Sequence, residues 1–60
     1  MEYVIKVKAN GYEETSLHVN AKNLKVAQSF ERESLRKFAA HNDISFSDAK
    51  GFGFVSIIRK

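Results

Sequence analysis

The sequence predicts an α+β fold of the order β-β-α-β, with a three-stranded antiparallel sheet of spatial order 2-1-3 and one helix packed on one face. Three observations lead to this prediction. Apolar and polar residues alternate near both ends of the chain, Asn10-Gly11 separates the first two alternating segments, and the middle of the chain repeats with the period of a helix. With 60 residues, the chain has room for one small domain, residues 1–60.

The first two strands are expected to form a hairpin. Residues 2–9 place Tyr3, Ile5 and Val7 on one side and lysines on the other, which is typical of a half-buried strand. Asn10-Gly11 follows, and because both residues tolerate positive φ the chain should reverse here. Residues 13–20 then alternate again, so we expect the second strand to run antiparallel to the first.

Residues 24–41 are predicted to form one amphipathic helix. Asn23 precedes this segment and is a suitable N-cap, since its side-chain oxygen can accept a free N–H of the first turn. At 100° per residue, Phe30 and Phe38 fall on one broad apolar face, which would pack on the sheet. Asn42 is expected to end the helix in the left-handed region.

The last strand is predicted at residues 52–59, beside the first strand and antiparallel to it. Residues 44–46 are either a short edge strand or a connection. A single helix covers only one face of a sheet, so the other face should expose the side chains that point away from the core.

Composition excludes several classes of function. The chain has no cysteine, and His18 and His41 fall on different elements with no serine or carboxylate at a triad spacing. We therefore expect no enzyme activity, no catalytic residue, no metal site and no cofactor. No apolar run is long enough to span a bilayer or to form a signal peptide, which predicts a cytoplasmic protein without a membrane partner. The net charge of +3 permits contact with phosphates or with an acidic protein groove.

Residues 50–57 are similar to the ribonucleoprotein octapeptide of RNA-recognition domains. Every position matches except the last, where Ile57 stands in place of Phe or Tyr. On a strand, Phe52 and Phe54 would project on one face for bases to stack on, and Lys50 would meet a phosphate. The alternative is that Phe52, Phe54 and Ile58 fill the core.

Over its whole length, the chain resembles the Dmd antitoxins of T-even-like phages. The likeness lies in the total length, the opening Met1-Glu2-x-Val4, a hairpin containing a glycine, a single central helix and a lone closing strand. The resemblance implies a non-enzymatic antitoxin in the host cytoplasm, which binds and blocks a host mRNA-degrading endoribonuclease toxin of the RnlA/LsoA type. A blocker that imitates RNA would be acidic, whereas this chain is basic, so shape and apolar contact are the expected basis of binding.

Three interaction hypotheses follow. The first is the antitoxin, with a contact surface on one flank of the helix: Phe30, Glu33, Lys37, His41 and Asn42. Phe30 lies at the edge of the apolar stripe, where it either anchors a partner or packs in the core. The second is a single-stranded RNA-binding module that uses Lys50, Phe52 and Phe54. The third is a homodimer that pairs through the terminal edge strand.

Overall fold

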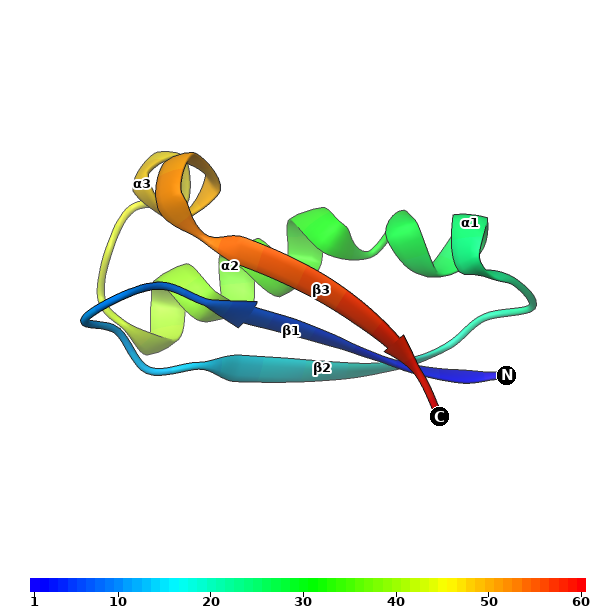
Figure 1. The fold of residues 1–60 in the computed structure, drawn as a ribbon. Coiled ribbons are helices and arrows are strands. Elements are labelled where there is room, and N and C mark those ends of the chain that lie inside the picture. The colour runs from blue at the N-terminus through cyan, green and yellow to red at the C-terminus, as the bar shows by residue number, and fades with distance from the viewer.

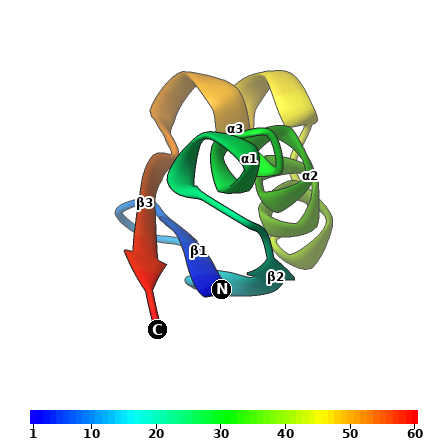
Figure 2. The same ribbon diagram turned by 90° about the vertical axis from the view of Figure 1, so that its right-hand side faces the viewer.

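A three-stranded antiparallel sheet with a layer of helices on one face makes up the computed structural model, which describes residues 1–60 (Figure 1). The strands are β1 (Glu2–Lys8), β2 (Thr15–Asn20) and β3 (Phe54–Arg59), in the spatial order β2-β1-β3. The helices are α1 (Leu24–Gln28), α2 (Glu31–His41) and α3 (Phe46–Phe52). The predicted fold class is confirmed, except that three helical segments rather than one cover the face (Figure 2).

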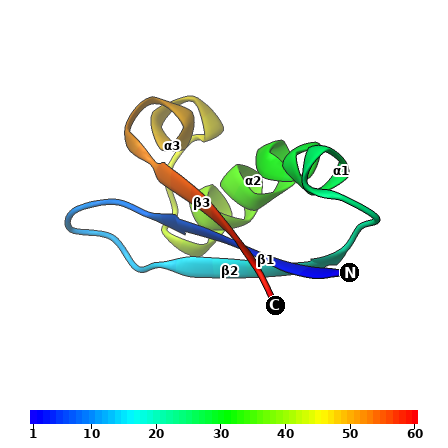
Figure 3. The ribbon, with the colours of Figure 1, turned by 45° about the vertical axis from the view of Figure 1, so that its right-hand side comes forward.

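The β1–β2 hairpin forms where the sequence predicts it. Gly11 has a φ of +88°, which a glycine adopts without a steric penalty. The register pairs Tyr3 with Val19 and Ile5 with Leu17, so the apolar residues of both strands share the face toward the helices. The sheet twists, and β3 runs at a clear angle to β2 (Figure 3).

The prediction of one continuous helix over residues 24–41 is wrong. The backbone N–H groups of Ser29 and Phe30 donate to the carbonyls of Val26 and Ala27, three residues back, and the Ser29 hydroxyl also donates to the Val26 carbonyl. These short-range bonds tighten the last turn of α1 and end it, because they replace the bonds that would continue the α-helix. α2 begins directly afterwards, with Phe30 as its N-cap residue. The Phe30 carbonyl accepts from the Ser34 N–H.

The predicted caps have different outcomes. Asn23 caps α1 as expected, since its Oδ1 accepts from the Val26 N–H at 2.9 Å. Asn42 does not adopt the left-handed region, because its φ is −99°. Asp43 takes that conformation instead, with a φ of +56°. The Asn42 side chain is thereby free to bond the hairpin.

α3 is the element that the sequence analysis missed. Ser45 is its N-cap, with Oγ accepting from the Asp48 N–H at 3.1 Å, and Ala49 is buried against α2. The Ser45-x-x-Asp48 spacing is a helix-start signal that points to this helix. Because α3 runs to Phe52, the last strand begins at Phe54 and not at residue 52.

The core consists of two apolar clusters that share the sheet. One cluster contains Tyr3, Ile5, Val19, Ala21 and Ala27; the other contains Val7, Leu35, Phe38, Ala39 and Ala49. Val55 packs against both clusters. The alternative that Phe52, Phe54 and Ile58 fill the core is wrong, because their exposed fractions are 46%, 64% and 47%.

Candidate functional site

The sheet face opposite the helices is uncovered, and we call it the open sheet face. Lys8 lies opposite Phe54, Lys6 opposite Ser56 and Val4 opposite Ile58. Directly paired residues of antiparallel strands point to the same face, so these side chains share one surface. The open sheet face comprises Glu2, Val4, Lys6, Lys8, Ser16, His18, Asn20, Phe54, Ser56 and Ile58.

Two large apolar side chains stand out on the open sheet face. Phe54 and Ile58 are both exposed, and Val4 between its neighbours His18 and Ile58 is buried. The Lys8 ammonium lies 6.0 Å from the centre of the Phe54 ring, within the range of a cation–π contact. The centre of the face is therefore polar, with Lys6 between Ser16 and Ser56, while Phe54 and Ile58 lie toward the two ends of β3.

The structure separates the three residues of the RNA-recognition-type segment. Only Phe54 lies on the open sheet face. Lys50 and Phe52 belong to α3, and the Phe52 ring stacks on Tyr12 of the hairpin with centroids 5.3 Å apart and planes 19° apart. The prediction that Lys50, Phe52 and Phe54 share one strand face is wrong, because helix α3 ends inside the segment that the pattern assigns to a strand.

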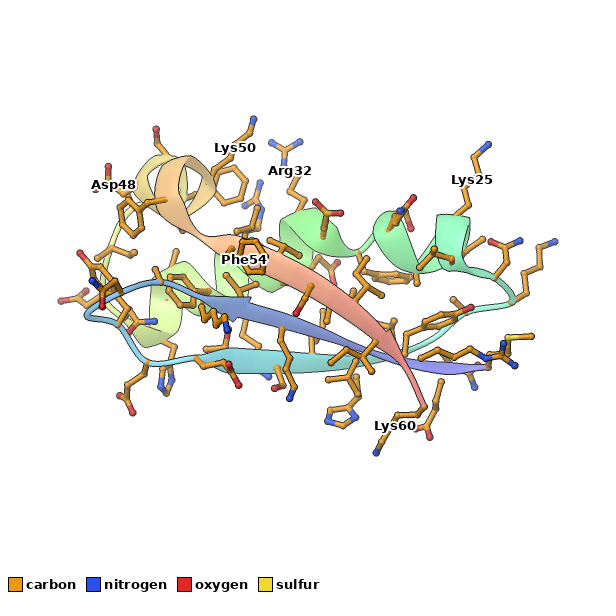
Figure 4. All side chains as sticks on the ribbon, viewed as in Figure 1. Lys25, Arg32, Asp48, Lys50, Phe54 and Lys60 are labelled. Atoms are coloured by element: carbon orange, nitrogen blue, oxygen red, sulfur yellow. The ribbon has the colours of Figure 1, made fainter.

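Lys50 lies instead at a shallow pocket between α2 and α3, with a volume of about 340 Å³. The pocket is lined by Gln28, Ser29, Glu31, Arg32, Leu35, Phe46 and Lys50. The guanidinium carbons of Arg32 and Arg36 lie 5.5 and 5.1 Å from the centre of the Phe46 ring. Figure 4 shows Arg32 and Lys50 pointing away from the sheet, so this basic surface lies on the opposite side of the molecule from the open sheet face.

The predicted partner-binding flank lies along α2 beside β2, and most of its polar side chains hold the fold together. The Lys37 ammonium donates to the Ser16 carbonyl of β2. Asn42 accepts from the Glu13 N–H at 2.8 Å and donates to the Glu13 carbonyl at 3.0 Å. His41 Nε2 lies 3.5 Å from Glu13 Oε1.

The other two residues of this flank differ from each other. Phe30 is half-buried and packs against the Ile5 cluster, so it contributes to the core. Glu33 is exposed and has no ion-pair partner. The flank thus exposes Glu33 to solvent, while Asn42 and Lys37 are engaged within the chain.

Sequence reasoning missed Ile58, Lys6 and Lys8 as candidate site residues. The signal that points to them is the alternation of strand residues, because the side of β1 that carries the lysines has to face away from the core. Assigning Phe54 and Ile58 to that side additionally requires the β1–β3 register, which the sequence does not encode locally.

Neither a metal site nor a membrane span is found in residues 1–60. No group of three or more His, Asp or Glu side chains is placed to hold a metal ion, and none of the helices has the length and apolarity needed to cross a membrane. Comparison with family models, with curated proteins and with solved structures finds no match to this chain.

Proposed function

We propose that the protein is a non-enzymatic inhibitor, an antitoxin of the phage type that binds a host mRNA-degrading endoribonuclease and blocks it by steric occlusion. The observation that carries this proposal is the exposure of Phe54 and Ile58 on a sheet face that no helix covers. Large apolar side chains that are exposed on one open face can act as interface anchors, and a few such anchors supply most of the affinity of an interface.

The kind of partner is inferred from the resemblance to the Dmd antitoxins. Of the features on which that resemblance depends, the structure contains the hairpin and the lone closing strand, whereas three helical segments stand in place of the single central helix. A chain of net charge +3 does not imitate the negative charge of RNA. Binding is therefore expected to rest on apolar contact, with Lys6 and Lys8 on the same face favouring acidic residues of the toxin.

The open sheet face is better suited to this role than the flank of α2. Lys37, His41 and Asn42 would each have to give up a contact with β2 or with the residues that precede it in order to bind a partner. Phe54 and Ile58 would not have to give up a hydrogen bond within the chain, because much of each side chain already meets solvent.

The proposal is tested by growth rescue of cells that express the toxin, together with calorimetry on the two purified proteins. The variants Phe54→Ala and Ile58→Ala are each expected to weaken toxin binding about tenfold or more, because each truncates an interface anchor. Leu24→Ala is the matched control: Leu24 is 51% exposed but belongs to α1, on the helical side of the molecule. Failure of the wild-type protein both to rescue growth and to bind the toxin would rule the proposal out.

A second candidate function is the binding of single-stranded RNA on the same face. It is favoured by one observation, the Lys8 ammonium beside the exposed Phe54 ring, which together offer a stacking surface and a phosphate contact. Fluorescence anisotropy with a labelled RNA should show affinity that falls with salt. Phe54→Ala should weaken binding about tenfold, while Phe52→Ala, on α3, should not. Equal losses in both variants, or no binding at low salt, would count against this candidate.

A further inference from the structure

The outer edge of β3 presents unpaired backbone groups. The Lys60 N–H donates to the Glu2 carbonyl at 2.9 Å, and in an antiparallel pair the bonded residues alternate along each strand. With the observed register, Phe54, Ser56 and Ile58 are therefore the β3 residues that bond to β1. The N–H and C=O groups of the residues between them point outward: Val55, Ile57 and Arg59.

The opposite edge of the sheet, formed by β2, is protected by other parts of the chain. The Ala21 N–H donates to the Met1 carbonyl at 2.9 Å, so by the same alternation Ser16, His18 and Asn20 point their backbone groups outward from β2. Lys37 caps the Ser16 carbonyl, and α2 packs on β2 and β1. A lysine and a covering helix are common means of protecting an edge strand from pairing.

No comparable protection exists at β3. No side chain of the protein bonds to the outward backbone groups of Val55, Ile57 or Arg59. Seen along the strands, α3 lies above the start of β3, and no helix lies outside the rest of the strand (Figure 2). Ile58 and Phe54, on the same strand, are among the most exposed large apolar residues of the chain.

We propose that β3 pairs with β3 of a second copy of this chain, antiparallel and about a two-fold axis at Ile57, to form one continuous sheet. In this register Ile57 lies opposite the partner's Ile57, and Val55 lies opposite the partner's Arg59. Every outward backbone group of one strand then meets an outward group of the other, so each pair exchanges two hydrogen bonds. Such an interface is isologous and closes the free edge.

The other two-fold registers are poorer. An axis at Ser56 or at Ile58 pairs only two of the three outward residues of each strand with outward residues of the other strand. An axis at Arg59 would place two guanidinium groups directly opposite each other, which is destabilising. An axis at Val55 would pair Ile57 with the partner's Gly53, which lies outside the strand and whose N–H is already donated to the Ala49 carbonyl. The Ile57 register has none of these defects.

The proposed register also suits the side chains. On the open sheet face, it places Phe54 opposite the partner's Lys60, whose ammonium can lie against the ring as Lys8 does from the other side. Ile58 lies opposite the partner's Ser56. Only 13 of the 60 residues are buried in the isolated chain, so a second copy would extend a small core.

The first test is sedimentation equilibrium over a range of concentrations. The apparent mass of the wild-type chain should rise from 6.8 kDa toward twice that value. Arg59→Pro removes an outward N–H at an edge position where proline is tolerated, and should weaken dimerisation about tenfold or more. Arg59→Ala keeps the N–H and should dimerise like the wild-type chain. A single 6.8 kDa species up to about 1 mM would overturn the proposal.

The second test needs no variant and uses amide hydrogen exchange of the wild-type chain. As concentration rises, exchange should slow at the amides of Val55, Ile57 and Arg59, because pairing protects outward N–H groups. The outward amides of Ser16, His18 and Asn20 are the internal control and should exchange at a constant rate. Slowing at the β2 amides instead, or a dimer equally strong in Arg59→Pro and Arg59→Ala, would contradict pairing through β3.

Discussion

Gly51 and Gly53 lie two residues apart and meet different surroundings. A Cβ atom at Gly53 would lie 2.5 Å from the Ala49 carbonyl oxygen and 3.3 Å from both Leu35 Cδ2 and Val7 Cγ1. The Gly53 N–H also donates to that carbonyl at 2.7 Å, so the carbonyl cannot move aside without loss of the bond. Gly53 thus permits the close approach of this part of the chain to Leu35 of α2 and Val7 of β1. Gly51 has no atom within 4 Å of its Cβ position.

We predict opposite effects of alanine at these two positions. Gly53→Ala should lower the free energy of unfolding by about 1–3 kcal/mol, as expected for overpacking against a fixed backbone group. Gly51→Ala should raise it by about 0.5–1 kcal/mol, because Gly51 lies within helix α3. Urea unfolding followed by circular dichroism, at one low protein concentration, measures both. A Gly53→Ala variant as stable as the wild-type chain would contradict the packing role.

At the scale of elements, α3 depends on its cap and on its contact with α2. A helix of seven residues is too short to be stable alone, so tertiary contacts must hold it. Buried Ala49 provides the contact with the Phe38 cluster, and Ser45 provides the cap. Because α3 ends at Phe52, β3 starts at Phe54.

We predict that Ser45→Ala destabilises the chain by about 1 kcal/mol through loss of the N-cap bond. Ser47→Ala is the matched control, since Ser47 is exposed in the same turn and its side chain makes no hydrogen bond. Amide exchange should show the loss localised to α3, because a local opening does not require the sheet to separate. Equal stability of the two variants would show that the cap contributes nothing.

At the scale of the whole molecule, the two core clusters are joined through β1 and β3. β1 supplies residues to both clusters, and Val55 of β3 packs against both. A domain of this length has a total stability of roughly 3–9 kcal/mol, at about 0.05–0.15 kcal/mol per residue. The loss of one large core side chain is therefore comparable with the stability of the entire fold.

We predict that Phe38→Ala, which truncates a fully buried ring, costs about 3–5 kcal/mol and leaves much of the chain unfolded at 25 °C. Phe54→Ala removes a ring of the same size from an exposed position and should leave the fold intact. Thermal unfolding by circular dichroism separates the two outcomes. If Phe38→Ala melted like the wild-type chain, the assignment of Phe38 to the core would be wrong.

Much of the fold was predictable because its signals are local. The alternation of Tyr3, Ile5 and Val7, the positive φ available at Gly11 and the side-chain oxygen of Asn23 act within a few residues of themselves, and each produces the element or cap that was predicted. The sheet order follows from chain direction and short connections, which are also properties of the sequence. These local signals do not identify what the chain binds. The proposed partner is inferred from the resemblance to the Dmd antitoxins.

The candidate surface was decided by tertiary structure. Helical periodicity does not reveal that α1 ends at the bonds from Ser29 and Phe30 to the carbonyls three residues back, and the octapeptide pattern does not reveal that Lys50 and Phe52 belong to a helix. Whether Phe54 faces the core or solvent depends on which β1 residue it pairs with, and a shift of one residue would turn its ring to the other face. Local sequence signals were enough to predict β1, β2 and the hairpin between them, since these depend on neighbouring residues. The exposure of Phe54 and the free edge of β3 depend on register and helix placement, which only the packed chain settles.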